Sequence, residues 1–218
     1  MNDRRTFSCK QATRRLRAVV APALAVAILA TACSGGNTRP VVGVVGDSIT
    51  VISAPGLESE LRGYALYIRA IDGQRIDEML PALRAELARH PKAVVINLGT
   101  NDALQSQTHP DWQPGFDTAW RLVESLPCVV YVTVNTAADT LYSHGTVAAD
   151  INTAIRTLAR EHHNIRIVDW NAAVHEDPSL LSGAKGPGDS IHPYSRSSWH
   201  WLGDNYRDAL LACGVHPA

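Results

Sequence analysis

Five short apolar runs, separated by stretches long enough to form helices, limit the fold more than any other feature of this chain. Most are rich in β-branched residues, and they cover residues 41–45, 65–71, 93–98, 129–134 and 165–169. Runs that are apolar throughout are typical of strands buried on both faces of a sheet. Between them, residues 76–87 and 147–161 repeat apolar side chains at helical spacing. This alternation predicts an α/β fold, a five-stranded parallel sheet covered by helices on both faces.

Polar residues follow these runs where a parallel sheet would gather them. Ser48 stands in Gly-Asp-Ser directly after the first run, Gly73 follows the second, and Asn101 lies in Gly-Thr-Asn-Asp after the third. Near the C-terminus, Asp189 and His192 are spaced Asp-x-x-His. Ligands of parallel α/β sheets bind beyond the C-terminal ends of the strands, so we expect these residues to meet at one edge of the sheet.

These residue types supply the parts of a serine hydrolase. A serine hydroxyl becomes a good nucleophile when an imidazole takes its proton, and a carboxylate fixes the tautomer of that imidazole. Ser48, His192 and Asp189 are therefore the expected nucleophile, base and orienting acid. Asp169, at the end of the fifth run, is an alternative acid. Asp189 is preferred because its spacing in a loop lets the carboxylate reach the His192 ring directly.

The order of the motifs resembles that of the SGNH hydrolases, also called the GDSL esterase and lipase family. The resemblance covers about residues 41–211, with Ile49 where the family usually has Leu. It implies a flavodoxin-like three-layer α/β/α sandwich. In that fold Ser48 would be the nucleophile, His192 the base and Asp189 its partner.

The same resemblance implies an oxyanion hole. It would consist of the backbone N–H groups of Ser48 and Gly73 and the side-chain amide of Asn101. The residue types suit this role, because a glycine without Cβ lets its amide approach a ligand closely and an asparagine donates without carrying a charge. One such donor is worth about 3 kcal/mol in the transition state. No metal and no other cofactor are expected for this chemistry.

The N-terminal residues have the pattern of an export signal. Basic residues precede an apolar stretch of about 13 residues, shorter than the roughly 20 that a spanning helix needs. Ala-Thr-Ala-Cys at 30–33 resembles a bacterial lipobox, although Ala30 stands where Leu is usual. We expect a signal peptide at 1–32, a tether at 33–40 and a hydrolase domain at 41–218. The exported protein would be lipid-anchored at Cys33 in the cell envelope, or secreted.

Charge limits the partners of the exported chain. From Cys33 onward there are 20 − 6 = 14 basic and 21 − 1 = 20 acidic residues, a net charge of about −6. Such a charge argues against nucleic acid as a partner and against electrostatic docking on anionic lipid. Membrane contact is expected only through a lipid anchor, and the sequence predicts no oligomeric state.

Two cysteines outside the leader, Cys128 and Cys213, form an even pair for an oxidising compartment. Cys128 opens the fourth run and Cys213 follows a helix expected over residues 195–211. Both should therefore lie at the edge of the sheet away from Ser48. The sequence leaves two outcomes open, a disulfide or two buried thiols.

The motifs together favour hydrolysis of carboxylic esters through an acyl-enzyme. The expected loops lack a long apolar lid, which favours short acyl or O-acetyl groups on a small molecule or on envelope carbohydrate. A lipase or thioesterase of the same fold is one alternative. Another is a non-catalytic envelope lipoprotein that binds carbohydrate or lipid at the same edge.

Overall fold

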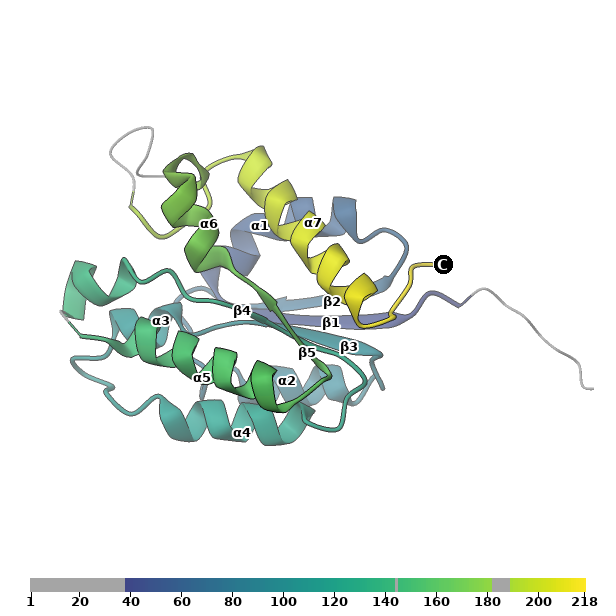
Figure 1. Cartoon of the computed structure of the whole chain (residues 1–218), viewed down its shortest axis with the longest axis horizontal. Coiled ribbons are helices and arrows are strands. Elements are labelled where there is room, and N and C mark those ends of the chain that lie inside the picture. Colours follow the sequence, from purple (N-terminus) through teal and green to yellow (C-terminus); the bar gives the residue numbers. More distant parts are fainter. Residues whose placement is uncertain (1–37, 144, 182–188) are drawn as a thin grey trace, which may run out of the picture. The chain divides into compact units, whose positions relative to one another are not determined.

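The computed structural model describes residues 38–143, 145–181 and 189–218. Its sheet has five parallel strands in the order β2-β1-β3-β4-β5. They are β1 (Val41–Gly46), β2 (Ala65–Ala70), β3 (Ala93–Asn97), β4 (Val129–Val132) and β5 (Ile165–Val168). Helices cover both faces of the sheet (Figure 1), so the α/β sandwich predicted from the sequence is confirmed.

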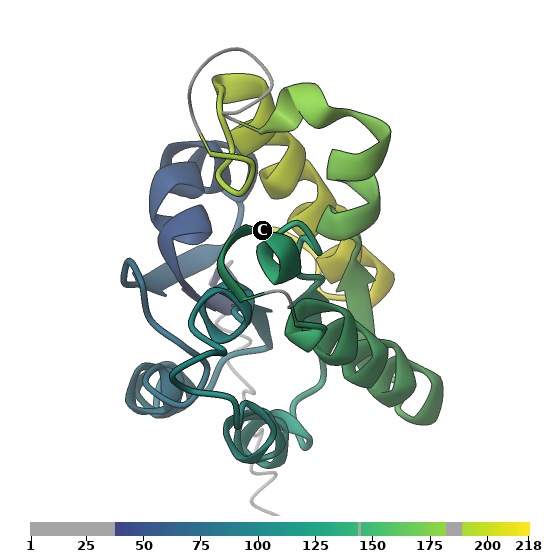
Figure 2. The same cartoon turned by 90° about the vertical axis from the view of Figure 1, so that its left-hand side faces the viewer.

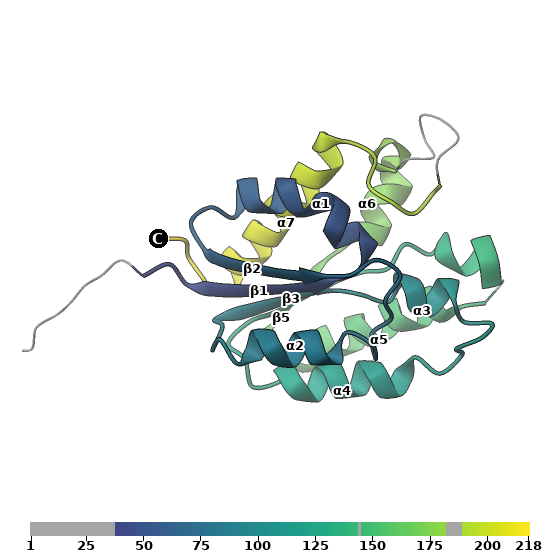
Figure 3. The ribbon, with the colours of Figure 1, turned by 180° about the vertical axis from the view of Figure 1, so that it is seen from behind.

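The helices divide into two layers, which Figures 1 and 3 show above and below the sheet. One layer holds α1 (Ser48–Glu60), α6 (Trp170–Glu176), the short 3₁₀ helix η2 (Pro178–Leu180) and α7 (Arg196–Ala212). The other layer holds α2 (Leu80–Leu87), α3 (Thr100–Leu104), α4 (Gln113–Val123) and α5 (Val147–Glu161). A single π-helical turn, η1 (Asp139–Ser143), precedes α5. Figure 2 looks along the strands from the side where they end, here called the C-terminal edge.

Burial explains the composition of the strands. β1 and β3 lie inside the sheet, and Val42, Val44 and Val95 are fully buried. Burying one such side chain contributes roughly 1.5 to 3 kcal/mol, so the continuous apolar runs stabilise the centre of the sheet. β2 is an edge strand, and Tyr67 and Arg69 on it are exposed. One face of β2 therefore tolerates polar side chains.

Helix α1 was not among the helices expected from apolar periodicity. Its buried positions include Thr50, Ser53 and Gly56, so no apolar stripe marks it in the sequence. Gly56 lies against α7, where an added Cβ would come within 2.5 Å of the backbone carbon of Trp199. A glycine is needed there because two helix backbones approach each other closely.

Several element ends differ from the expectations. The strands end one or two residues before the apolar runs 65–71, 93–98, 129–134 and 165–169 do, because the last residues of each run enter the loop. The helix expected over 76–87 begins only at Leu80. Helices α3, α6 and η2 were not expected from the sequence. Helices this short contain too few turns to leave a periodic pattern.

The two cysteines of the domain form a disulfide. Cys128 precedes β4 and Cys213 caps α7, with their Cα atoms 5.8 Å apart. Both lie at the edge opposite the C-terminal edge, as expected. A bridge that closes 85 residues stabilises a fold by about 4 to 5 kcal/mol in the loop-entropy account.

The export expectations concern the N-terminus. The signal peptide at 1–32, Cys33 and most of the tether at 33–40 lie outside the described residues. Within the described ranges, no helix is long and apolar enough to cross a membrane.

Candidate active site

Ser48 lies where β1 ends and α1 begins, at the C-terminal edge of the sheet. Asp47 caps the helix, since its Oδ1 accepts a hydrogen bond from the backbone N–H of Ile49 at 3.0 Å. The cap fixes the direction in which the first helical turn presents the Ser48 hydroxyl. The positive end of the α1 dipole also favours negative charge that develops beside Ser48.

His192 joins Ser48 to Asp189 in one chain of hydrogen bonds. Its Nε2 lies 2.8 Å from Ser48 Oγ, and its Nδ1 lies 2.7 Å from Asp189 Oδ2. An ionised carboxylate only accepts, so the proton of the neutral ring lies on Nδ1 and the lone pair of Nε2 faces the serine. The structure thus brings together three side chains whose association the sequence could only suggest.

The electrostatics of Asp189 favour this arrangement. Burial alone would raise the pKa of its carboxyl group, but hydrogen bonds from the backbone and side chain of His192 and from the backbone of Ile191 outweigh it. They lower the pKa to about 2. The carboxylate therefore stays charged at neutral pH and holds the ring of His192 in one orientation.

The Gly73 turn and Asn101 lie at the same edge. Gly46 pairs with Ala70 of β2 and with Asn97 of β3, so three strand ends are adjacent. Asn101 Nδ2 donates to the carbonyl oxygen of Gln74 at 3.1 Å, which joins α3 to the turn. This bond uses one of the two amide protons of Asn101.

The conformation of Gly73 explains why glycine stands there. Its φ is +75°, in the left-handed region that other residues adopt at a cost. Its carbonyl oxygen accepts from Gln105 Nε2 at 2.8 Å, and Arg75 Nη1 donates to Gln105 Oε1 at 3.1 Å. Gln105 therefore holds the turn in place from α3. Sequence reasoning missed this residue, because a glutamine in a loop carries no distinctive signal.

A second supporting residue, Asn135, was also missed. It follows β4, and its Nδ2 donates to the carbonyl oxygen of Ser190 at 2.9 Å, inside the segment that carries Asp189 and His192. Its Oδ1 accepts from the backbone N–H of Ala137 at 3.0 Å. The available signal was its position, since a polar residue directly after a buried strand lies at the C-terminal edge.

The alternative acid, Asp169, has a structural role. It accepts hydrogen bonds from Arg156 at 2.6 Å and Thr133 at 2.8 Å, and it caps α6 through the backbone N–H of Ala172. No hydrogen bond of Asp169 to His192 is found. Its position after β5 matched that of an active-site residue, but its partners bind it to neighbouring elements.

Two further carboxyl groups are buried near the site. Asp47 is fully buried, and burial raises its pKa to about 7, although the hydrogen bond from Ile49 and the charge of His192 oppose the shift. Asp102 accepts from the backbone N–H of Ile76 at 3.1 Å, and burial raises its pKa to about 6. Both accept hydrogen bonds from backbone N–H groups. Among the described residues, no cluster of three or more His, Cys, Asp or Glu side chains could hold a metal ion.

The model of the GDSL-like lipase/acylhydrolase family matches residues 44–196, well over half of the chain. The chain belongs to the GDSL-like lipase/acylhydrolase family. This GDSL family match includes every residue of the hydrogen-bonded chain from Ser48 to Asp189. No curated protein matches the sequence.

Solved structures of GDSL proteins and their relatives share the fold. The C-terminal catalytic domain of peptidoglycan O-acetyltransferase A from Streptococcus pneumoniae is 20% identical, with a TM-score of 0.67 over 83% of this chain and 97% of that one. A lipolytic G-D-S-L protein from Veillonella parvula is 16% identical, with a TM-score of 0.60 over 78% and 97%. The esterase EstA from Pseudoalteromonas sp. is 14% identical, with a TM-score of 0.57 over 79% and 97%. At these identities the likeness establishes the fold.

Proposed function

We propose that this protein is a serine esterase that hydrolyses carboxylic esters at Ser48. The observation that carries the proposal is the hydrogen-bonded chain from Ser48 Oγ through His192 to Asp189, with contacts of 2.8 and 2.7 Å. A hydroxyl, an imidazole of fixed tautomer and a charged carboxylate in that order form a nucleophile with its base. Membership of a family of lipases and acylhydrolases supports the same chemistry.

The reaction proceeds through an acyl-enzyme. Ser48 Oγ attacks the ester carbonyl carbon while its proton moves to Nε2 of His192. The C–O bond to the alcohol then breaks, and the alcohol leaves with that proton. Water next attacks the acyl-serine and gives a proton to His192, and the acid leaves as Ser48 Oγ takes the proton back. Asp189 stays charged throughout and stabilises the imidazolium.

Negative charge on the carbonyl oxygen needs donors that are already in place. The Ser48 amide, the Gly73 amide and the Asn101 side chain are proposed to form this oxyanion hole. All three lie at the C-terminal edge, and Asn101 is only 6% exposed, so water competes weakly for its amide. Gln105 and the hydrogen bond from Asn101 to Gln74 limit movement of the Gly73 turn.

Short acyl or O-acetyl esters are the proposed substrates. Asn101 and the Gly73 turn, which are proposed to bind the carbonyl oxygen, are polar and offer no apolar surface for a long acyl chain. The structural neighbours include a peptidoglycan O-acetyltransferase and an esterase, which supports small acyl groups. A lipase acting on long chains and a thioesterase are the competing specificities.

The O-acetyltransferase likeness also favours a second candidate function, acyl transfer. In that reaction a sugar hydroxyl replaces water in the second half of the cycle, and Ser48 and His192 keep the same roles. The test uses p-nitrophenyl acetate as the acyl donor and a saccharide as the acceptor. If more p-nitrophenol than acetate is released, the acetyl group has been transferred to the saccharide. Equal amounts of both products at every acceptor concentration would identify hydrolysis.

We further propose that the protein is exported and either lipid-anchored at Cys33 or secreted, on the strength of the leader pattern in residues 1–33. The described chain enters β1 at the edge opposite Ser48, so an anchor at Cys33 would attach the domain by the end remote from the site. Mass spectrometry of the N-terminus from the native host tests this. A diacylglyceryl group on Cys33 supports the anchor, and a chain that keeps residues 1–32 contradicts export.

Hydrolysis of p-nitrophenyl acetate, butyrate and palmitate tests the proposed function. We expect turnover of the acetate and butyrate, loss of turnover in Ser48→Ala, and fastest reaction with the shorter chains. Ser106→Ala is the control, because that hydroxyl donates to the backbone carbonyl of Ala103 away from His192. If folded wild-type protein turns over none of the esters, the non-catalytic binding protein replaces the esterase. A faster palmitate reaction contradicts the short-chain specificity.

A further inference from the structure

A basic pocket lies between α1 and α7, outside the site already described. It has a volume of about 230 Å³ and is lined in part by Ser59, Arg62, Arg196, Trp199 and His200. Arg62 follows α1, and Arg196 begins α7. The pocket therefore depends on the close packing of these two helices.

In the described part of the chain, the two arginines of this pocket have no acidic partner. Among the described residues, neither Arg62 nor Arg196 forms an ion pair, and Arg62 only donates weakly to Ser59 Oγ at 3.5 Å. Other arginines of the domain, such as Arg69, Arg156 and Arg207, each contact a carboxylate. Two unpaired guanidinium groups in one pocket of an acidic protein create a local positive potential.

Nearby groups leave this charge uncompensated. The Glu60 carboxylate lies beside the pocket, but it already accepts hydrogen bonds from His200 Nδ1 at 2.6 Å and from Arg207 at 3.0 Å. The indole Nε1 of Trp199, which lines the pocket, is buried with no hydrogen-bond acceptor in the described part of the chain. The pocket thus has two guanidinium groups and no carboxylate among its lining residues.

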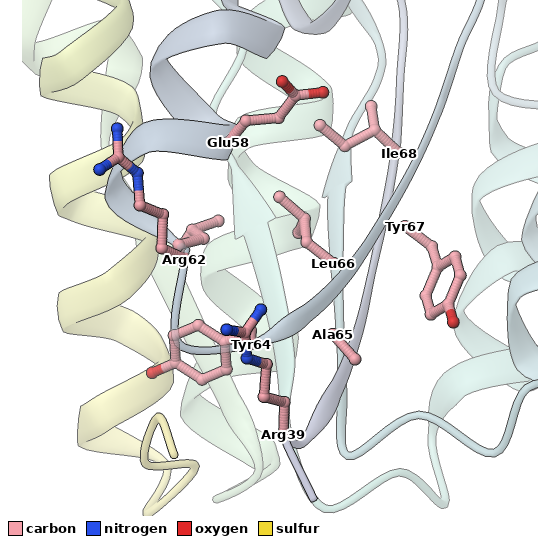
Figure 4. Close-up of a pocket in the computed structure, with 9 residues that line it drawn as sticks. Arg39, Glu58, Arg62, Tyr64, Ala65, Leu66, Tyr67 and Ile68 are labelled. Carbon is pink, nitrogen blue, oxygen red and sulfur yellow. The ribbon is translucent and has the colours of Figure 1, made fainter.

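A second, larger pocket continues from the first. It has a volume of about 670 Å³, shares Arg62 with the first pocket, and is lined also by Arg39, Glu58, Leu66 and Tyr67. Figure 4 shows Arg62 rising toward α7 and Leu66 on the same side of β2, with Tyr67 on the other side. Arg39 has no acidic partner among the described residues either, so Glu58 is the one carboxylate against two guanidinium groups here.

The first pocket lies within reach of a substrate bound at Ser48. Pro55, which also lines it, is seven positions along α1 from Ser48, a distance of about 10 Å at 1.5 Å per residue. Arg196 follows His192 by four residues. Arg62 lies 14 positions from Ser48, roughly 20 Å on the same measure, so only a glycan of several sugar rings that places an ester at Ser48 can extend along α1 to Arg62.

We propose that the pocket of Arg62 and Arg196 binds carboxylate groups of an acidic polysaccharide whose ester is cleaved at Ser48. The inference rests on the proposed esterase function and narrows its substrate to O-acylated, carboxylate-bearing glycans. Each guanidinium binds a carboxylate through two parallel hydrogen bonds. The second pocket, with Arg39, extends the contact along the polymer.

Two acetylated polymers of opposite character test the proposal. Acetate release is measured from O-acetylated polygalacturonate, which carries carboxylates, and from O-acetylated xylan, which is neutral. The quantity of interest is the ratio of the two kcat/KM values. We expect each of Arg62→Ala and Arg196→Ala to lower this ratio about fivefold, and the double variant to lower it about 20-fold. Arg62→Lys should retain part of the ratio because it keeps the charge.

Arg84→Ala is the matched control, since Arg84 is an arginine of α2 on the other face of the sheet. If folded Arg62→Ala and Arg196→Ala keep the wild-type ratio, as Arg84→Ala should, the proposal is overturned. So would a wild-type ratio that 0.5 M salt does not reduce, because contacts between exposed charges are screened (about 4 Å Debye length).

Two further outcomes separate the proposal from its competitors. If Arg62→Glu and Arg196→Glu abolish binding to vesicles of phosphatidylglycerol while the polymer ratio stays unchanged, the pocket is a membrane-docking patch and the proposal is wrong. If the wild-type protein hydrolyses no ester, the proposed function has failed. Calorimetric titration with unacetylated polygalacturonate then still tests the pocket, since Arg62→Ala must weaken binding about fivefold.

Discussion

Two histidine–carboxylate pairs lie at either end of the segment that opens α7, and they differ in what completes them. His192 Nδ1 is 2.7 Å from Asp189, and His200 Nδ1 is 2.6 Å from Glu60. The second ring nitrogen of His192 meets the Ser48 hydroxyl, whereas the second oxygen of Glu60 meets Arg207 at 3.0 Å. A histidine beside a carboxylate is therefore no sign of catalysis by itself. The third partner decides the role.

Their supports differ as well. His200 and Glu60 belong to regular helices, α7 and α1, whose packing fixes both side chains. Asp189 and His192 lie in irregular chain that depends on individual hydrogen bonds. Asp189 Oδ1 accepts from two backbone N–H groups, at 2.8 and 2.9 Å. Loops carried by a rigid sheet can adopt the geometry that chemistry requires, while helices impose their own.

Replacing each histidine gives the largest expected difference between the pairs. His192→Ala removes the base and should lower kcat for p-nitrophenyl acetate by about 10⁴-fold. His200→Ala removes a helix contact and should change kcat by less than about twofold. Steady-state kinetics of both variants measures the two kcat values against wild type. Comparable losses in the two would show that the His200 pair also acts in catalysis.

Replacing the Asp189 carboxylate tests whether its charge holds the imidazole of His192 in the tautomer and orientation that catalysis needs. In Asp189→Asn the new amide oxygen can still accept from the loop amides, but the side chain no longer carries the charge that stabilises the imidazolium. We expect kcat to fall by about 10³-fold with little change in KM. Measured against wild type over pH 6 to 9, activity that stays within a factor of about two would contradict the role of Asp189.

The sequence predicted the candidate residues of the site better than the residues that hold its loops in place. Ser48, Asn101 and Asp189 stand in short motifs at strand ends, where parallel topology brings them together. Asn135 and Gln105 act through backbone carbonyls of loops that are close only in the folded chain. Pairings of that kind depend on tertiary geometry, so no spacing in the sequence reveals them.

The elements of the fold also differ in how well the sequence predicts them. Buried strands are visible in the sequence because both faces must be apolar. Helix α1 is not visible, since it buries Ser53 and Gly56 to let α7 approach. Likewise α6 and η2 are too short to establish a period. Burial of large apolar side chains leaves a pattern, whereas close packing of small residues does not.

An asparagine lies beside each pair, and comparing the two tests the support of the loop. Asn135 Nδ2 donates to the carbonyl oxygen of Ser190, next to Asp189, and Asn205 Nδ2 donates to Trp201, next to His200. Asn135→Ala should lower kcat by about tenfold, because small displacements of His192 weaken proton transfer. Asn205→Ala is the control and should leave kcat unchanged. Equal kinetics of both variants would remove Asn135 from the site.

Stability against pH separates two carboxyl groups of the same edge. Burial raises the pKa of Asp47 to about 7, so its contribution is complete below pH 4 and is lost as pH rises through 7. Hydrogen bonds lower the pKa of Asp189 to about 2, so its contribution is present above pH 4 and is lost as pH falls toward 2. The two groups should act on the melting temperature in opposite directions.

Melting curves of Asp47→Asn and wild type between pH 4 and 8 check the first half of this prediction. The new amide oxygen can still accept from the N–H of Ile49, so the cap of α1 is retained. We expect wild type to lose melting temperature from pH 5 to 8 and the variant to lose less. Parallel curves would mean that Asp47 titrates in the folded protein as it does in the unfolded chain.

Glu60→Gln should have the smallest effect on kcat/KM. It tests whether the pair of His200 and Glu60 contributes to activity at all. The side chain of Glu60 is only partly exposed, and a hydrogen bond from His200 lowers the pKa of its carboxyl group, with a second contact from Arg207. Exposed pairs of this type are screened by salt and contribute little. We expect kcat/KM for p-nitrophenyl acetate to change by less than about twofold, and any loss of melting temperature to vanish in 0.5 M salt. A larger loss that persists in salt would show that packing between α1 and α7 supports the geometry of Ser48 and His192. The His200 pair would then affect the geometry of the His192 pair through the packing of α1 against α7, and the two pairs would not be independent.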